Sequence, residues 1–452
     1  MRSWTAMFAA VFAALLALSA TPARQAPAVY SVDEKALREY AGVYRWGPNA
    51  FIYLQLWHEF IGFDKPAGLV AFDESGDVRT LYPTARDQFF AGPGAAVSTP
   101  VESRITFQRD GTGKIASLTW RRERGAPRTA QRVEIEKRED VRFSNGDVQL
   151  AGTLISPARA GTHPAVILVH GSGAENREYI LPWARFLIRR GMAVLGYDKR
   201  GVGASSGDWN TASFDDLAGD AVAALEYLKT RSDIDHAQIG LLGVSQAGWI
   251  MPLAAVRAKD FAFLISISGA GVPVAETTLD QARNEMTMTG MPSQAVEQIM
   301  GLLNLQLQFA RTGQGWDEYA AAREQIVAKM GAAPETIPGT PDHPYWQFIK
   351  RIYFYDPAPT LRRLQVPTLA LFGELDNNIV AEKNKAAWEA ALKAGGNPDY
   401  TLVVVPKANH SQFEAKIGSN KEAPSLQRFV PAYFTTIQDW LAKRVRGFGL
   451  PR

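Results

Sequence analysis

Cysteine is absent from this chain of 452 residues. Its absence excludes disulfide bonds, zinc–thiolate sites, iron–sulfur clusters and a thiol nucleophile. The chain also has almost no excess of one sign of charge. It contains 49 Lys and Arg residues and 46 Asp and Glu residues, which gives a net charge of +3. An excess this small gives no electrostatic footprint for nucleic acid, so we expect no nucleic-acid partner.

Metal and nucleotide motifs are missing too. The six histidines do not show the spacing of the helical zinc-binding motif, and no glycine-rich nucleotide loop follows an expected strand. We therefore expect neither a metal site nor a cofactor. The chemistry of the protein is then expected to come from its own side chains.

The amino end lacks a hydrophobic run long enough to cross a membrane. Its apolar run covers residues 7–18, which is roughly 12 residues, whereas a membrane-spanning helix needs about 20. Arg2 precedes the run, and small residues follow it up to Ala23. This arrangement is typical of a secretory signal peptide. We expect residues 1–23 to be removed and the protein to be exported, to a periplasm or out of the cell, without a stable membrane span.

The full sequence has the composition of a globular protein, with 46% hydrophobic and 21% charged residues. Its length allows two or three domains. Over about residues 30–130, apolar and polar residues alternate between turn signals, which predicts a small antiparallel β-rich accessory domain. We expect its aromatic side chains to form mainly its core, with a ligand-binding mouth as the alternative. These aromatics include Trp46, Trp57, Trp120, Phe89 and Phe90.

The pattern changes after about residue 131. Strand-like runs, expected at 165–169, 193–197, 239–244, 261–267, 368–372 and 401–405, now alternate with amphipathic helices. An antiparallel pair at 133–143 and 148–156 precedes them. This alternation predicts an α/β domain over residues 131–452, built on a mostly parallel sheet with helices on both faces.

Two serines lie in surroundings that suggest a nucleophile. Ser205 lies in the one strict Gly-x-Ser-x-Gly match, but polar residues follow it, and we interpret it as part of a turn. Ser245 follows an apolar strand directly and precedes a helical stretch, with Gly243 two residues earlier. A sharp strand-to-helix turn exposes a serine hydroxyl and directs a helix N-terminus at it. We predict that Ser245 is the nucleophile; a purely structural serine at the turn is the alternative.

Three stretches together resemble the serine α/β-hydrolases, in particular exported bacterial esterases and dienelactone-hydrolase-like enzymes. They are PAVILVHGSG at residues 164–173, GYDKRGVG at 196–203 and LLGVSQAGW at 241–249. The resemblance extends over about residues 140–445. One departure is Ala247, which stands where the strict nucleophile motif has glycine, with Gly248 one position later. The added methyl group loosens the match without breaking it.

The resemblance implies a catalytic triad in the order serine, acid, histidine. His410 is the one histidine beyond the late strands, and Asp376 stands where the family places its carboxylate. Glu374 is the rival acid. The family also implies an oxyanion hole formed by the backbone N–H groups of Gln246 and Ser172.

These assignments predict a carboxylesterase-like serine hydrolase that acts on a small-molecule ester through an acyl-enzyme intermediate. Ser245 is the nucleophile, His410 the general base, and Asp376 the acid that orients the imidazole. A serine peptidase of the prolyl-oligopeptidase or proline-iminopeptidase type shares this constellation and is the main alternative. A thioesterase and a non-catalytic binding protein on the same scaffold are further alternatives.

A long insertion separates the expected strands at 261–267 and 368–372. It contains roughly 100 residues, whereas a simple crossover needs only a few dozen. Its first part is rich in helix formers and its end is rich in aromatics. We predict a helical cap at about 271–360, inserted over the mouth of the site. Its apolar face is expected to supply an acyl or alkyl pocket, while most of its aromatics pack the cap onto the core.

Overall fold

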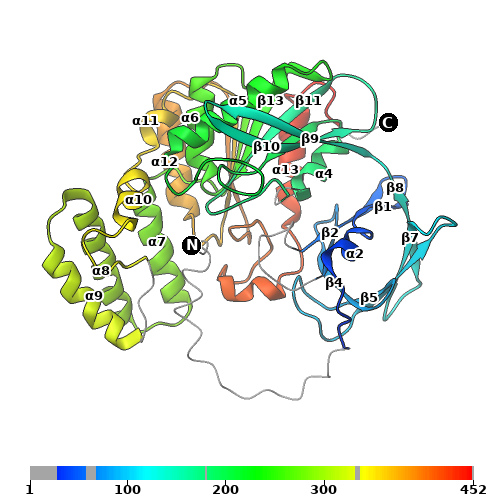
Figure 1. Ribbon diagram of the computed structural model, residues 1–452, viewed down its shortest axis with the longest axis horizontal. Helices are drawn as coiled ribbons and strands as arrows, with labels where there is room; N and C mark the ends of the chain where they lie inside the picture. Colours follow the sequence, from blue (N-terminus) through cyan, green and yellow to red (C-terminus); the bar gives the residue numbers. More distant parts are fainter. Residues whose placement is uncertain (1–27, 58–67, 179–180, 331–335, 450–452) are drawn as a thin grey trace.

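The computed structural model describes residues 28–57, 68–178, 181–330 and 336–449. The predicted signal peptide, residues 1–23, lies outside the described residues. No helix within these ranges is both long and apolar enough to span a bilayer. The described chain forms a β-barrel, a large sheet covered by helices, and a group of helices inserted between two strands of that sheet (Figure 1).

Eight antiparallel strands near the amino end close into a barrel, because each strand pairs with the next and β8 pairs with β1. They are β1 Gly42–Gly47, β2 Ala50–Leu56, β3 Leu69–Asp73, β4 Val78–Ala85, β5 Gln88–Ala91, β6 Ser103–Arg109, β7 Ile115–Arg122 and β8 Arg128–Val133. Alternate residues point inward and form an apolar core that includes Tyr44, Leu54 and Phe107. The short helix α2 (Glu34–Arg38) adds Leu37 to this core.

The second sheet has eight strands in the order β16-β15-β14-β13-β11-β12-β10-β9. β9 (Glu136–Asn145) and β10 (Val148–Pro157) form an antiparallel pair at one edge. The other six strands run parallel to one another. They are β11 His163–Val169, β12 Ala193–Tyr197, β13 Ile234–Val244, β14 Phe263–Ile267, β15 Thr368–Gly373 and β16 Tyr400–Val405. Most of these strands are apolar along their whole length because both faces of the sheet are covered.

Helices cover both faces of this sheet, which confirms the predicted α/β fold class with a preceding antiparallel β domain. One face packs against α5 (Phe214–Lys229), α6 (Ala247–Arg257) and α12 (Ala381–Ala394). The opposite face packs against α4 (Leu181–Ile188) and α13 (Pro431–Ala442).

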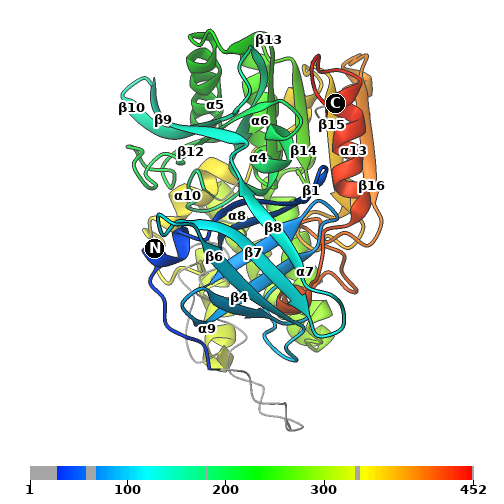
Figure 2. The same ribbon diagram turned by 90° about the vertical axis from the view of Figure 1, so that its right-hand side faces the viewer.

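The barrel packs against the side of the sheet that α4 and α13 cover (Figure 2). Its outward-facing Phe51, Tyr53 and Phe72 share one apolar cluster with Phe186 of α4 and Tyr433 of α13. The barrel and the sheet therefore share one hydrophobic core and are joined by side-chain packing as well as by the connecting chain.

Backbone hydrogen bonds reinforce this contact. The N–H of Val78 in β4 donates to the carbonyl of Gln427 at 2.8 Å, and the N–H of Ala95 donates to the carbonyl of Leu426 at 2.6 Å. A segment between the last strand and the last helix of the large sheet is thereby bound along the barrel.

Five helices are inserted between β14 and β15 and form a lobe below the sheet, on the other side from the barrel (Figure 1). They are α7 Val274–Met288, α8 Ser293–Thr312, α9 Trp316–Met330, α10 Tyr345–Ile352 and α11 Ala358–Leu361. The rings of Phe309, Trp316, Tyr319 and Trp346 pack against one another with centroids 4.8 to 6.3 Å apart. These aromatics pack the lobe internally. The expected acyl pocket on its apolar face stays a prediction.

Candidate active site

The parallel strands of the large sheet bring four polar residues to one edge. Ser245 follows β13, Ser268 follows β14, Asp376 lies just beyond β15, and His410 lies beyond β16. These strands are successive neighbours in the sheet, each about 4.8 Å from the next. Residues that are distant in sequence therefore meet at the carboxyl edge, which is where open α/β sheets bind their ligands.

Ser245 lies on a sharp turn between β13 and α6. Its φ angle is 58°, in the left-handed region, where a non-glycine residue is strained by about 1–3 kcal/mol. A Cβ on Gly243 would lie 2.4 Å from the Cβ of Ala247, and a Cβ on Gly248 would lie 2.6 Å from the Cα of Gly269. At Gly243 the strand lies too close to α6 for any side chain, and at Gly248 the helix lies too close to the chain just beyond β14. The turn therefore needs glycine at 243 and 248 but accommodates alanine at 247.

Asp376 and His410 contact each other directly. The Nδ1 of His410 lies 2.8 Å from Oδ2 of Asp376 and 3.0 Å from Oδ1. Oδ1 also accepts hydrogen bonds from the backbone N–H groups of Asn378 and Ile379, at 2.9 and 2.8 Å. The carboxylate side chain is completely buried, whereas the histidine side chain is 21% exposed. A fixed carboxylate thus orients an imidazole that stays accessible.

The loop that carries His410 is held next to Ser245 through Ser268. The N–H of Ser245 donates to the carbonyl of Ile267 at 2.9 Å. The hydroxyl of the following residue, Ser268, donates to the backbone carbonyl of His410 at 2.8 Å, and Gln412 Nε2 donates to the same hydroxyl at 3.0 Å. The loop after β16 therefore folds back over the end of β14, one strand away from Ser245.

The histidine ring has a single hydrogen-bond partner in the described chain, Asp376. Contact between such an imidazole and a serine hydroxyl often tightens only when substrate binds. Nε2 of His410 has no hydrogen-bond partner among the residues that the structure describes.

Two backbone N–H groups close to this turn find no acceptor among the residues that the structure describes, those of Gln246 and Ser172. Gln246 lies at the N-terminus of α6, where the helix dipole favours negative charge. Ser172 is exposed in the loop after β11, and β11 is the neighbour of β13 in the sheet. Free donors at these two positions are what an oxyanion hole requires.

A buried ammonium group lies under the loop after β11. Lys199 is 1% exposed, and its Nζ donates to the carbonyls of Gly171 and Gly173 and to Oε1 of Gln246, at 2.8, 3.0 and 3.1 Å. Glu175 accepts a hydrogen bond from the N–H of Gly171 at 2.7 Å. Burial lowers the pKa of Lys199 and raises the pKa of Glu175, while the attraction between the two charges opposes both shifts.

His170, at the start of the same loop, is not a candidate base. Its Nε2 contacts the carbonyl of Tyr197, and burial lowers the pKa of the ring to about 3. The ring is therefore neutral near pH 7 and fixes the position of the loop.

The rival residues are engaged elsewhere. The hydroxyl of Ser205 donates to the carbonyl of Asp198 at 2.7 Å and accepts from the N–H of Ala151 at 2.9 Å, which fixes a turn as the sequence predicts. Glu374 is exposed and accepts from the N–H of Lys407 at 2.7 Å. Neither side chain is directed at Ser245 by these contacts.

The inserted helices reach the acid loop through α7. Gln281 donates to Oδ1 of Asn378 at 3.0 Å, and Asn284 donates to the carbonyl of Asn377 at 3.3 Å. Both partners directly follow Asp376, so α7 forms one wall beside the acid.

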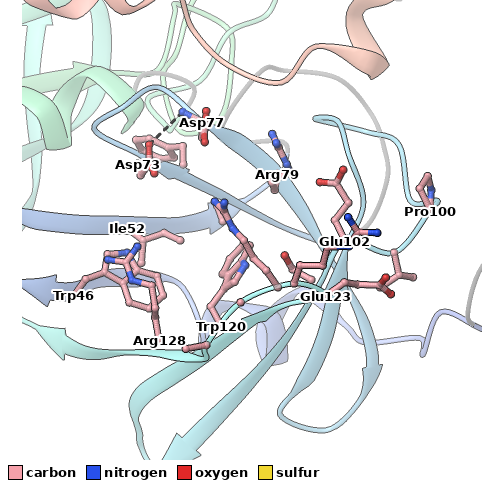
Figure 3. A pocket seen from close by; sticks show the side chains of 18 residues that line it. Trp46, Ile52, Asp73, Asp77, Arg79, Pro100, Glu102, Trp120, Glu123 and Arg128 are labelled. Carbon is pink, nitrogen blue, oxygen red and sulfur yellow. Dashed lines mark hydrogen bonds between the residues drawn. The ribbon is translucent and has the colours of Figure 1, made fainter.

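A separate pocket of 680 Å³ lies at one end of the barrel (Figure 3). Trp46, Ile52 and Trp120 line it, and the guanidinium of Arg128 lies 4.8 Å from the centroid of the Trp46 ring. The other three barrel aromatics singled out in the sequence, Trp57, Phe89 and Phe90, are buried. None of the residues gathered at the carboxyl edge lines this pocket. Within the described ranges, no group of three or more potential metal-ligating side chains occurs either.

Four supporting residues are not identified from the sequence: Ser268, Gln412, Lys199 and Glu175. Ser268 and Gln412 have positive φ angles of 48° and 64° that no local motif announces. Lys199 stands inside one of the stretches that carry the family resemblance. A lysine two residues after the end of an apolar strand is the one signal that could draw attention to it.

Comparison with known proteins identifies the family. Residues 161–415, more than half of the chain, match the family model described as serine aminopeptidase, S33. Esterase EstD of Thermotoga maritima is 26% identical over 337 residues, which cover 72% of this chain and 71% of the esterase. Dipeptidyl-peptidase 5 of Porphyromonas gingivalis is 23% identical over 261 residues, which cover 55% of this chain and 30% of that protein.

Solved structures also resemble the chain. An esterase of Pyrococcus furiosus, 17% identical, covers 68% of this chain and 90% of its own, with a TM-score of 0.42. The resemblance to serine α/β-hydrolases read from the three sequence stretches is confirmed by the family match. The chain therefore belongs to the serine aminopeptidase S33 family of the α/β-hydrolase superfamily and is an esterase-like hydrolase.

Proposed function

We propose that the protein is a serine carboxylesterase that cleaves small-molecule esters through an acyl-enzyme intermediate. The observation that carries the proposal is the placement of Ser245, on a strained strand-to-helix turn, at the same sheet edge as the Asp376–His410 pair. Similarity to Esterase EstD supports the choice of an ester substrate. The signal-peptide pattern of residues 1–23 supports export as part of the same proposal.

In the first half of the reaction, the hydroxyl of Ser245 attacks the ester carbonyl carbon while Nε2 of His410 accepts its proton. Asp376 keeps the other ring nitrogen protonated and stabilises the imidazolium that forms. The carbonyl oxygen becomes negative, and the backbone N–H groups of Gln246 and Ser172 stabilise it, with about 3 kcal/mol lost when one such donor is removed.

This first tetrahedral intermediate collapses: its bond to the alkoxy group breaks, the imidazolium of His410 donates its proton to the leaving alcohol, and the acyl group stays on Ser245. In the second half, water replaces the alcohol. The same imidazole then accepts a proton from water, which attacks the acyl group on Ser245. The tetrahedral intermediate collapses, the serine regains its proton, and the carboxylic acid leaves.

Labelling with a fluorophosphonate tests the nucleophile. We expect the wild-type protein to be modified on the peptide that contains Ser245, as read by mass spectrometry, and Ser245→Ala to lose all labelling. Ser205→Ala is the matched control and should keep it. Labelling that persists in Ser245→Ala would overturn the proposed nucleophile.

The peptidase alternative deserves a direct test, because the matching family model is described as a serine aminopeptidase and one relative is a dipeptidyl-peptidase. We expect nitrophenyl acyl esters to be turned over at least about 100-fold more efficiently than aminoacyl nitroanilides, measured as kcat/KM. Turnover of the anilides alone would replace the esterase with a peptidase that uses the same triad.

A further inference from the structure

One buried charge contacts both halves of the proposed oxyanion hole. Lys199 reaches the loop after β11 through the carbonyls of Gly171 and Gly173, and it reaches the nucleophile turn through the side chain of Gln246. These three acceptors match the three donors of an ammonium group. The side chain is 1% exposed, so water does not replace any of these partners at low cost.

The bond to Gly171 determines where the N–H of Ser172 points. The carbonyl of Gly171 and the N–H of Ser172 belong to one peptide group, which is planar and trans. The two bonds therefore point in opposite directions. Because Lys199 holds the carbonyl at 2.8 Å, the N–H is directed away from the lysine and cannot rotate without breaking that bond.

Gly171 is also held from its other side. Its own N–H donates to Oε2 of Glu175 at 2.7 Å, and the backbone N–H of Lys199 donates to the carbonyl of Glu175 at 3.2 Å. A Cβ on Gly171 would lie 2.9 Å from Oε1 of Glu175. Carboxylate and ammonium thus fix the two peptide groups that flank the Gly171 Cα.

The third bond links this loop to the turn after β13. Gln246 supplies the second proposed donor through its backbone and accepts from Lys199 through its side chain, at 3.1 Å. One ammonium group therefore bridges the two loops that supply the proposed N–H donors. A shift of either loop would stretch a bond to a buried charge.

We propose that Lys199 is the positioning residue of the oxyanion hole, which aligns the N–H groups of Ser172 and Gln246 for the transition state. This inference rests on the proposed function. Because the alignment acts on the negative oxygen that develops during the reaction, its loss lowers kcat and leaves ground-state binding largely unchanged.

Two variants test this role. Lys199→Met removes the charge at similar length but leaves Glu175 without its counter-charge. The double variant Lys199→Met/Glu175→Gln removes both charges together and keeps an amide next to the N–H of Gly171, so it leaves no uncompensated charge in the interior. We expect kcat on a nitrophenyl ester to fall about 100-fold in the double variant, with KM within about threefold.

The matched control is a second buried ion pair, formed by Arg200, which follows Lys199 in the sequence, and Asp220. Arg200 Nη2 lies 2.6 Å from Oδ1 of Asp220, and neither residue contacts Gln246 or the loop at 171–173 through a hydrogen bond in the described chain. Arg200→Met/Asp220→Asn therefore removes a comparable pair without breaking a hydrogen bond to either loop that supplies the oxyanion donors. We expect its kcat to stay within about threefold of the wild type.

A transition-state analogue gives the second readout. The affinity of a trifluoromethyl ketone, which forms a tetrahedral adduct on the serine, should fall in the Lys199→Met/Glu175→Gln variant in parallel with kcat/KM. An unchanged kcat in this variant, with Ser245 still labelled by fluorophosphonate, overturns the role of Lys199 alone. Absence of labelling at Ser245 in the wild-type protein overturns the proposed function instead. An equal loss of kcat in the Arg200→Met/Asp220→Asn control also overturns the positioning role.

Discussion

The barrel pocket and the carboxyl edge of the large sheet both carry charged side chains, but they hold them differently. At the pocket, Arg122, Glu123 and Arg124 are exposed and make no side-chain hydrogen bond or ion pair within the described chain. At the sheet edge, Lys199 and Asp376 are buried, and their polar atoms are bonded to neighbouring groups.

The difference separates a positioned site from an adaptable surface. A buried charge is tolerated only with partners, and those partners fix its direction. An exposed charge is solvated, and its side chain changes rotamer freely. Chemistry that depends on direction is therefore expected at the sheet edge, and substitutions in the two regions should have very different effects.

The largest effect is expected at the acid. Asp376→Asn keeps the size of the side chain but presents the wrong hydrogen-bonding groups to Nδ1 of His410, so we expect kcat to fall by about 10⁴-fold. Steady-state hydrolysis of a nitrophenyl ester measures it. Glu374→Gln is the control and should change kcat less than twofold. A large loss in Glu374→Gln with little in Asp376→Asn would exchange the roles of the two acids.

The next effect concerns acid stability. Burial lowers the pKa of His170 to about 3, below the value of about 6.5 for an unfolded histidine. The unfolded chain therefore binds a proton that the folded chain does not, so this stability is complete above about pH 6.5 and is lost as the pH falls toward 3.

Between pH 7 and 4.5, His170 alone should lower the free energy of unfolding by about 2–3 kcal/mol. Urea unfolding of the wild type and of His170→Gln at both pH values measures this decrease in the free energy of unfolding. The variant should not show the part that comes from His170. The exposed His236→Gln serves as control and should behave like the wild type. The same pH dependence in His170→Gln as in the wild type would show that the ring is not held neutral.

A smaller effect is expected at the serine that anchors the His410 loop. Ser268→Ala removes the bond to the carbonyl of His410, so we expect a loss of about 1 kcal/mol in stability and about a tenfold drop in kcat as the imidazole loses its alignment. Ser266→Ala is the matched control, because the hydroxyl of Ser266 is buried without a hydrogen-bond partner among the described residues. Thermal unfolding and ester kinetics measure the two effects. Equal losses of stability and kcat in Ser268→Ala and Ser266→Ala would contradict the proposed role of Ser268 in holding the His410 loop.

The smallest effect is expected at the barrel pocket. Arg122→Ala and Arg124→Ala remove exposed, unpaired charges and should change stability by less than about 0.5 kcal/mol, with kcat/KM for a small ester unchanged. A change in kcat/KM above about threefold would break the contrast between the two regions and connect the pocket to the reaction.

Much of the sheet and the nucleophile turn could be predicted from the sequence. β15 and β16 are short apolar runs bounded by turn residues, so their limits lie within one residue of those expected. The strand-to-helix turn at Ser245 could be predicted because an apolar run precedes the serine and a helical stretch follows it. The sequence also predicts Ser205 as part of a turn, and the structure shows the bonds that hold it there.

The supporting contacts could not be predicted in the same way. Asp198 accepts hydrogen bonds from backbone N–H groups, while Arg200 pairs with Asp220, twenty positions later. Closure of the barrel depends on pairing β1 with β8, and no local pattern encodes a pairing between distant strands. Lys199 and Ser268 donate hydrogen bonds to backbone carbonyls. Because every residue has a backbone carbonyl, the sequence does not indicate which of them a side chain will bind.

The segment bound along the barrel links the accessory domain to the histidine. Beyond the carbonyls that accept from Val78 and Ala95, the chain continues to Val430, whose N–H donates to the carbonyl of Gln412, two residues after His410. Cutting the chain near residue 131 would therefore not release an independent enzyme. It would remove the barrel partners of the segment that supports the loop of His410, so we expect a version without the barrel to need other contacts for that segment.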